Sequence, residues 1–107
     1  MVRSIIAILG GVLLCVTEVA ATPEKGQQVF AAQKCSMCHS VAGKGNAKGP
    51  LDAAGKLSAD ELHQWLVNPV EMSKKANSTR KPPMKSYASL SKDDQDALVA
   101  YMLSLKK

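Results

Sequence analysis

Aromatic side chains are scarce in this chain of 107 residues, which has only Phe30, Trp65, Tyr87 and Tyr101. A chain of this length folds as one domain, and so few large side chains give that domain a thin core. Domains this small usually need a disulfide, a metal or another cross-link to be stable. The composition therefore excludes a large enzyme and raises the question of what holds the domain together.

The sequence also lacks an apolar run long enough to span a membrane. Residues 5–16 are small and apolar, but Glu18 ends this stretch well short of the roughly 20 residues that a membrane helix needs. Arg3 precedes the run, and Ala20 and Ala21 follow it as small residues that a signal peptidase can read. This layout is typical of a secretory signal. We predict a signal peptide at residues 1–21 and an exported domain at residues 22–107, in the periplasm of a Gram-negative bacterium.

Cysteine is equally rare, with three residues in the chain. Cys15 lies inside the predicted signal peptide, and Leu14 before it is bulkier than the residue that usually precedes a lipid-modified cysteine. The exported domain then keeps one pair, in the motif Cys35-Ser36-Met37-Cys38-His39. A local disulfide, a redox dithiol, a zinc site and covalent haem attachment are the four explanations of this motif.

Covalent haem attachment explains the motif best. Two thiols can add to the two vinyl groups of haem, and the adjacent His39 can bind the iron. A redox dithiol normally accompanies a βαβ pattern, and the sequence shows no strand-like alternation. Zinc would need two further cysteine or histidine ligands, and His63 is the one remaining candidate. A local disulfide is the simplest explanation in an exported protein, but His39 stands at the place that haem attachment requires.

Caps and breakers predict an all-α domain without a credible sheet. Thr22 and Pro23 begin a helix that we expect to reach about Lys34. A capping box that starts at Ser58 opens a second helix, and Asn68 is expected to cap a short third one.

Ser91 is predicted to cap the last helix. Apolar residues of this helix recur at helical spacing, namely Ala97, Leu98, Tyr101, Met102 and Leu105. Residues 41–56 and 77–90 are rich in glycine, proline and polar residues and are expected to form loops.

A haem iron held by His39 needs a ligand on its other side, and one methionine is better placed than the rest. Pro82 and Pro83 stiffen the loop directly before Met84, which lowers the entropy cost of holding a weak thioether ligand. Two permanent ligands would let the iron change its oxidation state and would leave no position open for a substrate. Met37 sits between the two anchoring cysteines and cannot reach across the ring. Core packing or solvent exposure explains the other candidates better, namely His63, Met72 and Met102.

Residues 26–105 resemble a class I monohaem cytochrome c of the small bacterial type. The resemblance rests on the Cys-x-x-Cys-His motif after a helix with Gly26 and Phe30, on Gly49-Pro50-Leu51, on Pro82-Pro83-Met84, and on Leu98 and Tyr101 of the last helix. It implies a cytochrome c fold with about four helices around one haem c, attached through Cys35 and Cys38.

The same resemblance implies roles for single residues. The backbone of Pro50 would accept a hydrogen bond from His39, and Met84 would be the sixth ligand of the iron. The last helix would cross the first at Gly26 and Phe30. Trp65 resembles a tryptophan that contacts a haem propionate in related proteins, and core packing is the other explanation of it.

Negative charge is missing from the part of the chain that contains Met84. Residues 73–91 carry five cations and no acid, and they account for the whole formal excess of +5 in the exported domain. Such a run is often only a solvated face. Beside a haem edge it would instead steer acidic redox proteins toward the haem. Nucleic acid is a poor partner for an exported protein whose basic stretch lacks interleaved aromatic residues.

The sequence therefore predicts a soluble, monomeric electron carrier rather than an enzyme. Single electrons would pass between a donor and an acceptor through a haem ligated by His39 and Met84. Two alternatives remain open at this point. One is a ligand-binding haem sensor or minor peroxidase with a labile sixth ligand, and the other is a haem subunit of a larger oxidoreductase.

Overall fold

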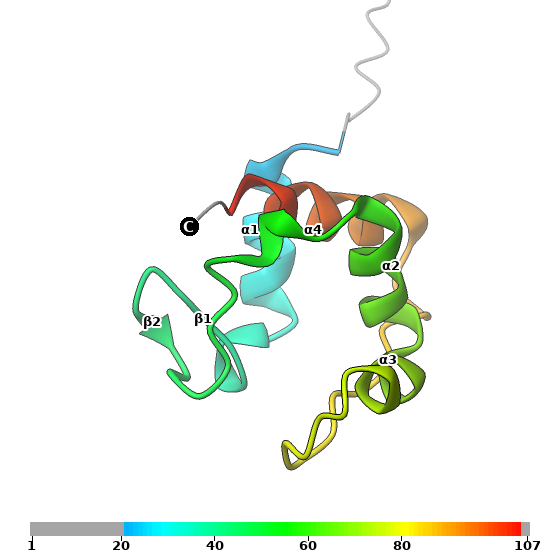
Figure 1. The fold of residues 1–107 in the computed structure, drawn as a ribbon. Helices are drawn as coiled ribbons and strands as arrows, with labels where there is room; N and C mark the ends of the chain where they lie inside the picture. Colours follow the sequence, from blue (N-terminus) through cyan, green and yellow to red (C-terminus); the bar gives the residue numbers. More distant parts are fainter. Residues whose placement is uncertain (1–20, 106–107) are drawn as a thin grey trace, which may run out of the picture.

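The computed structural model describes residues 21–105, and the all-α prediction is confirmed for this part of the chain (Figure 1). The predicted signal peptide therefore lies almost entirely outside the described residues. Among residues 21–105, no helix combines the length and apolarity needed to cross a membrane. The elements in chain order are helix α1 (Pro23–Ala32), the 3₁₀ turn η1 (Cys35–Met37), strands β1 (Ser40–Val41) and β2 (Lys44–Gly45), the 3₁₀ turn η2 (Ala54–Lys56), and helices α2 (Ala59–Val67), α3 (Pro69–Lys75) and α4 (Lys92–Ser104).

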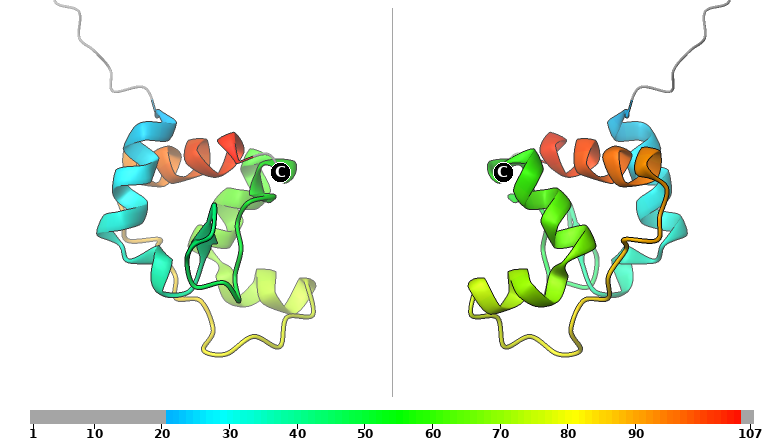
Figure 2. Two further views of the ribbon diagram at one scale, coloured as in Figure 1. Left: turned by 90° about the vertical axis from the view of Figure 1, so that its left-hand side faces the viewer. Right: turned by 90° about the vertical axis from the view of Figure 1, so that its right-hand side faces the viewer.

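The first and last helices cross in direct contact, as the sequence predicts (Figures 1 and 2). Gly26 lies at the crossing, where an added Cβ would stand 2.5 Å from the Cβ of Tyr101 and 2.8 Å from the carbonyl carbon of Ala97. The rings of Phe30 and Tyr101 meet edge to face beside it, with their centroids 5.5 Å apart. A residue without a side chain thus lets the two backbones approach each other.

Helix α4 forms the centre of the small core. Ala97 and Leu98 are 0% and 1% exposed, and Leu62 and Leu66 of α2 belong to the same buried cluster. The turn η2 is attached to the end of α4, because the backbone N–H of Gly55 donates to the carbonyl of Leu105 at 2.7 Å. The core therefore joins the two ends of the described chain to its middle.

Most of the predicted helix starts are confirmed in atomic detail. The side chain of Thr22 accepts a hydrogen bond from the N–H of Lys25, and Ser91 caps α4 in the same way. Ser58 and Glu61 form the reciprocal pair of a capping box, with bonds of 3.1 and 3.3 Å.

Two details of the predicted helices are wrong. The side chain of Asn68 caps nothing, because this residue both ends α2 and precedes α3, and its backbone makes the bonds at the junction. The first helix ends at Ala32 rather than near Lys34, whose left-handed φ of 56° turns the chain into η1.

A short antiparallel hairpin, β1–β2, is an element that the sequence reading missed. Ala42 and Gly43 have φ values of 50° and 79°, the positive pair that a tight two-residue hairpin turn requires. Each strand has two residues, so no alternation of polar and apolar residues can reveal it.

Candidate haem site

Two thiols and a histidine lie together where α1 ends. The turn η1 brings the N–H groups of Cys38 and His39 within 3.1 and 2.9 Å of the Cys35 carbonyl. Cys35 is half-buried and Cys38 exposed, and both are free thiols rather than a disulfide. Burial raises the pKa of the Cys35 thiol, while a backbone hydrogen bond and the nearby Lys85 oppose this shift.

The ring of His39 is oriented by one hydrogen bond, from Nδ1 to the carbonyl of Gly49 at 3.0 Å. A histidine that donates through Nδ1 presents Nε2 as its free donor of an electron pair to a metal. Burial lowers the pKa of His39, the bond to Gly49 raises it, and the charge of Arg80 lowers it further. The net shift favours the neutral ring, which is the form that binds iron.

The predicted bond from His39 to the backbone of Pro50 is wrong by one residue. Ser40 and Pro50 form a parallel bridge in which the N–H of Ser40 donates to the carbonyl of Gly49 and the N–H of Leu51 donates to that of Ser40. The carbonyl that faces His39 is therefore the one before Pro50.

Gly49 also allows a long-range contact. The guanidinium of Arg80 donates to the carbonyl of Cys38, and a Cβ on Gly49 would collide with both groups. Arg80 belongs to the predicted loop at residues 77–90. This hydrogen bond therefore places the segment that contains Met84 against the cysteine motif.

Met84 itself is half-buried and packs against the same hydrophobic cluster as Cys35. Tyr87 lies near both cysteines, which add to the effect of burial in raising its pKa. Lys85 lies above the Tyr87 ring, with Nζ 5.1 Å from the centroid. A thioether, two thiols and an oriented imidazole thus gather in one region of the fold.

Comparison with known proteins identifies the family. The family model described as cytochrome c matches residues 23–106. The chain belongs to the cytochrome c family. Its haem c is attached covalently through Cys35 and Cys38, and the free thiols and the oriented His39 fit this group. Proteins of this kind transfer electrons through the haem.

One relative of the cytochrome is cytochrome c oxidase subunit 2 of Alkalihalophilus pseudofirmus. The two are 35% identical over 92 residues, which cover 77% of this chain and 25% of the relative. The cytochrome thus spans about a quarter of the length of that protein. No solved structure matches the chain.

The remaining candidate ligands have other surroundings in the cytochrome. Nε2 of His63 donates to Oε1 of Gln95 at 2.9 Å, and Met102 is buried in the core. Met37 is 69% exposed between the two cysteines, and Met72 lines a hollow between α2 and α3. Among residues 21–105, no group of three or more histidine, cysteine or acidic side chains could hold a metal ion, so the zinc explanation has no support.

Trp65 is half-buried on α2 and lines the same hollow, with Leu57 and Met72 as neighbours. Its contact with a haem propionate stays a prediction.

Sequence reasoning missed three residues of the site region: Gly49 as acceptor, Arg80 as donor and Gln95 as the partner of His63. Arg80 counted only as one of five cations, and no local pattern reveals a contact across 42 residues. Gln95 left a signal, since it continues the spacing of Leu98 and Met102 as a polar residue on an apolar face.

Proposed function

We propose that this cytochrome is a periplasmic electron carrier that passes single electrons between redox partners through an iron ligated by His39 and Met84. The bond from Arg80 to the Cys38 carbonyl carries this proposal, because it holds the Met84 segment beside the haem attachment motif. The haem, when bound, supplies a one-electron change of oxidation state. No catalytic group is needed for that step, so we infer a carrier rather than an enzyme.

The residues around the iron have separate tasks in this proposal. His39 would bind the iron through Nε2, while its Nδ1–H donates to the Gly49 carbonyl and fixes the ring. Met84, which is half-buried, would supply the second protein ligand of the iron. Thioether ligation favours ferrous iron and raises the reduction potential, and it excludes outside ligands.

Replacing Met84 by leucine tests the ligation. We expect the reduced wild-type protein to leave its spectrum unchanged when carbon monoxide is added, and Met84→Leu to bind carbon monoxide and to have a lower reduction potential. Met72→Leu is the matched control, because Met72 is a partly buried methionine in α3. Carbon monoxide binding to the wild type would favour the ligand-binding sensor or peroxidase instead.

We also propose that acidic-faced redox proteins dock beside the haem motif. Lys81 and Lys85 are exposed in the acid-free segment 73–91, and the Lys85 charge acts on Cys35. Met37, exposed between the cysteines, offers an apolar contact at the same place. A weak polar interface with a small apolar centre suits fast binding and release.

Charge reversal tests this docking surface. The double variant K81E/K85E should slow electron transfer from an acidic donor protein at low salt, and the rate should lose most of its dependence on ionic strength. Lys56→Glu is the control, since Lys56 lies in η2 near the end of α4. If the double variant and the control behave alike, the docking proposal is wrong.

The likeness to cytochrome c oxidase subunit 2 favours a second candidate, a haem subunit or close partner of an oxidase. The mass of the native protein in its own membranes and periplasm distinguishes the two. A monomer supports the carrier, and a stable complex with oxidase subunits supports the second candidate.

A further inference from the structure

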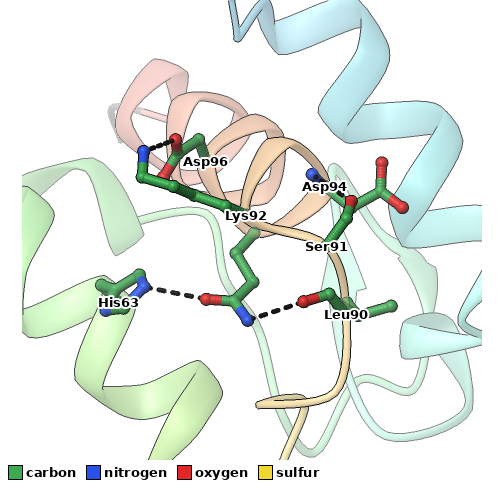
Figure 3. Close-up of polar contacts among 7 residues, drawn as sticks. His63, Leu90, Ser91, Lys92, Asp94 and Asp96 are labelled. Atoms are coloured by element: carbon green, nitrogen blue, oxygen red, sulfur yellow. Dashed lines mark hydrogen bonds and ion pairs between the residues drawn. The ribbon is translucent and has the colours of Figure 1, made fainter.

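Gln95 is a buried polar side chain on the apolar face of α4, with 8% of its surface exposed. Burying an amide is costly unless its hydrogen bonds are made. Its Nε2 lies 3.0 Å from the carbonyl of Leu90, 3.3 Å from that of Ala88 and 3.4 Å from that of Tyr87. Its Oε1 accepts the bond from His63, and Figure 3 draws this bond together with the one to Leu90.

The three carbonyl groups belong to the irregular segment that follows Met84 along the chain. Backbone bonds satisfy part of this segment, since the carbonyl of Tyr87 also accepts from the N–H of Leu90 at 3.0 Å, and the side chain of Gln95 adds to them. The two hydrogens of this NH2 group, shared among three nearby carbonyls, hold this segment against α4.

The end of α2 holds the same segment from another side. The hydroxyl of Ser86 donates to the carbonyl of Val67 at 2.9 Å, and the N–H of Tyr87 donates to that of Leu66 at 2.7 Å. These carbonyls lie in the last turn of α2, where helix geometry leaves them without partners. His63, from the same helix, orients Gln95 and can donate through Nε2 whether its ring is neutral or protonated.

We propose that Gln95, oriented by His63, is a positioning residue that holds residues 85–90 and thereby keeps the Met84 thioether on the haem iron. This inference rests on the proposed ligation by Met84. A thioether is a weak ligand, so the bound fraction depends on how freely its segment can move away from the iron. Gln95 acts here through the backbone that follows Met84.

Imidazole competes with Met84 for the ferric iron. The apparent affinity for imidazole therefore measures how firmly Met84 is held. Gln95→Met keeps an unbranched side chain of similar length and removes every hydrogen bond of the amide. We expect the apparent imidazole affinity to rise roughly tenfold, since a buried amide that loses its bonds releases the segment. Gln28→Met, the same change at an exposed position of α1, should leave the affinity as in the wild type.

Two substitutions of His63 test the same network without changing α4. His63→Leu removes the donor and should also raise the imidazole affinity. His63→Gln restores an N–H donor of similar reach and should bring the affinity back toward the wild-type value. This pair keeps the proposal testable if the Gln95 variant fails to take up haem.

If Gln95 only stabilised the fold, its loss would lower the melting temperature without changing the imidazole affinity. Val99→Ala removes buried apolar volume from the same helix and should lower the melting temperature without changing imidazole affinity. If Met84→Leu opens the iron while Gln95→Met and His63→Leu bind imidazole like the wild type, the positioning role is overturned and the ligation stands. If Met84→Leu itself changes nothing, the ligation is wrong and the positioning role falls with it.

Discussion

The guanidinium of Arg80 and the backbone carbonyl of Cys38 are joined by a hydrogen bond that links the two halves of the haem site. This contact also brings a permanent positive charge close to His39, whose pKa it helps to lower. The charge therefore acts where the iron changes its oxidation state. A nearby cation opposes ferric iron, which carries one more positive charge than ferrous iron.

Removing the charge of Arg80 should lower the reduction potential. Arg80→Met abolishes both the charge and the hydrogen bond, whereas Arg80→Lys keeps the charge and loses the planar fork. We expect the methionine variant to have a lower midpoint potential than the lysine variant in a spectroelectrochemical titration at low salt. Lys81→Met, at the adjacent exposed position, is the control. Equal potentials for both Arg80 variants would contradict the electrostatic argument.

A side chain at Gly26 should disrupt the crossing of α1 and α4. The added methyl group of Gly26→Ala meets backbone atoms of Ala97, which cannot rotate away as a side-chain tip could. Overpacking of this kind costs about 1–3 kcal/mol, against a gain in helix propensity of about 1 kcal/mol. We expect net destabilisation in guanidinium unfolding.

Gln27→Ala, at an exposed position of the same helix, should be neutral or slightly stabilising. A more stable Gly26→Ala variant would show that the helices can separate without cost.

The two helix starts at Ser58 and Asn68 should respond differently to alanine. Ser58 accepts a capping bond from Glu61, so Ser58→Ala should lower the free energy of unfolding by about 1 kcal/mol. The side chain of Asn68 makes no capping bond, so Asn68→Ala should cost much less. Denaturant unfolding of both variants checks this, and equal losses would contradict the assignment of caps.

These two positions show what sequence reasoning could and could not reach. Ser58 was predictable because a capping box is a local pattern of a few residues. Asn68 has the right residue type, but its backbone serves two helices at once, and only the path of the chain reveals that. The pairing of Gly26 with the last helix came from the family resemblance rather than from any local rule.

The residues of the candidate site also fall into two groups, those that a local motif predicts and those that depend on contacts in the fold. Cys35, Cys38 and His39 stand in one motif and needed no tertiary information, and the chemistry of haem attachment set their roles. The acceptor for His39 depended on the register of the Ser40–Pro50 bridge and was misplaced by one residue. Arg80 acts on a carbonyl 42 residues away, and Gln95 joins nearby loop carbonyls to the side chain of His63, 32 residues away. Residue type alone reveals none of these partners.

Alkaline pH should destabilise the protein through Tyr101. Burial, together with the charge of Asp52, raises the pKa of Tyr101 above its ordinary value of 10.0. A raised pKa in the folded state stabilises the protein below about pH 10, and this contribution is lost as the pH rises through the folded-state pKa.

Tyr101→Phe cannot ionise and should therefore lose less thermal stability between pH 8 and pH 11 than the wild type. Melting temperatures of both proteins at the two pH values measure this. The same loss in both would exclude Tyr101 as the titrating group.

The contact between Gly26 and Ala97 has a consequence for biogenesis. Helix α1 packs mainly on α4, so the interior of this domain cannot close before residues 92–104 are present. Until then we expect the thiols of Cys35 and Cys38 to lie on an open chain, where a porphyrin can reach them. Late closure of this kind would let attachment precede compaction.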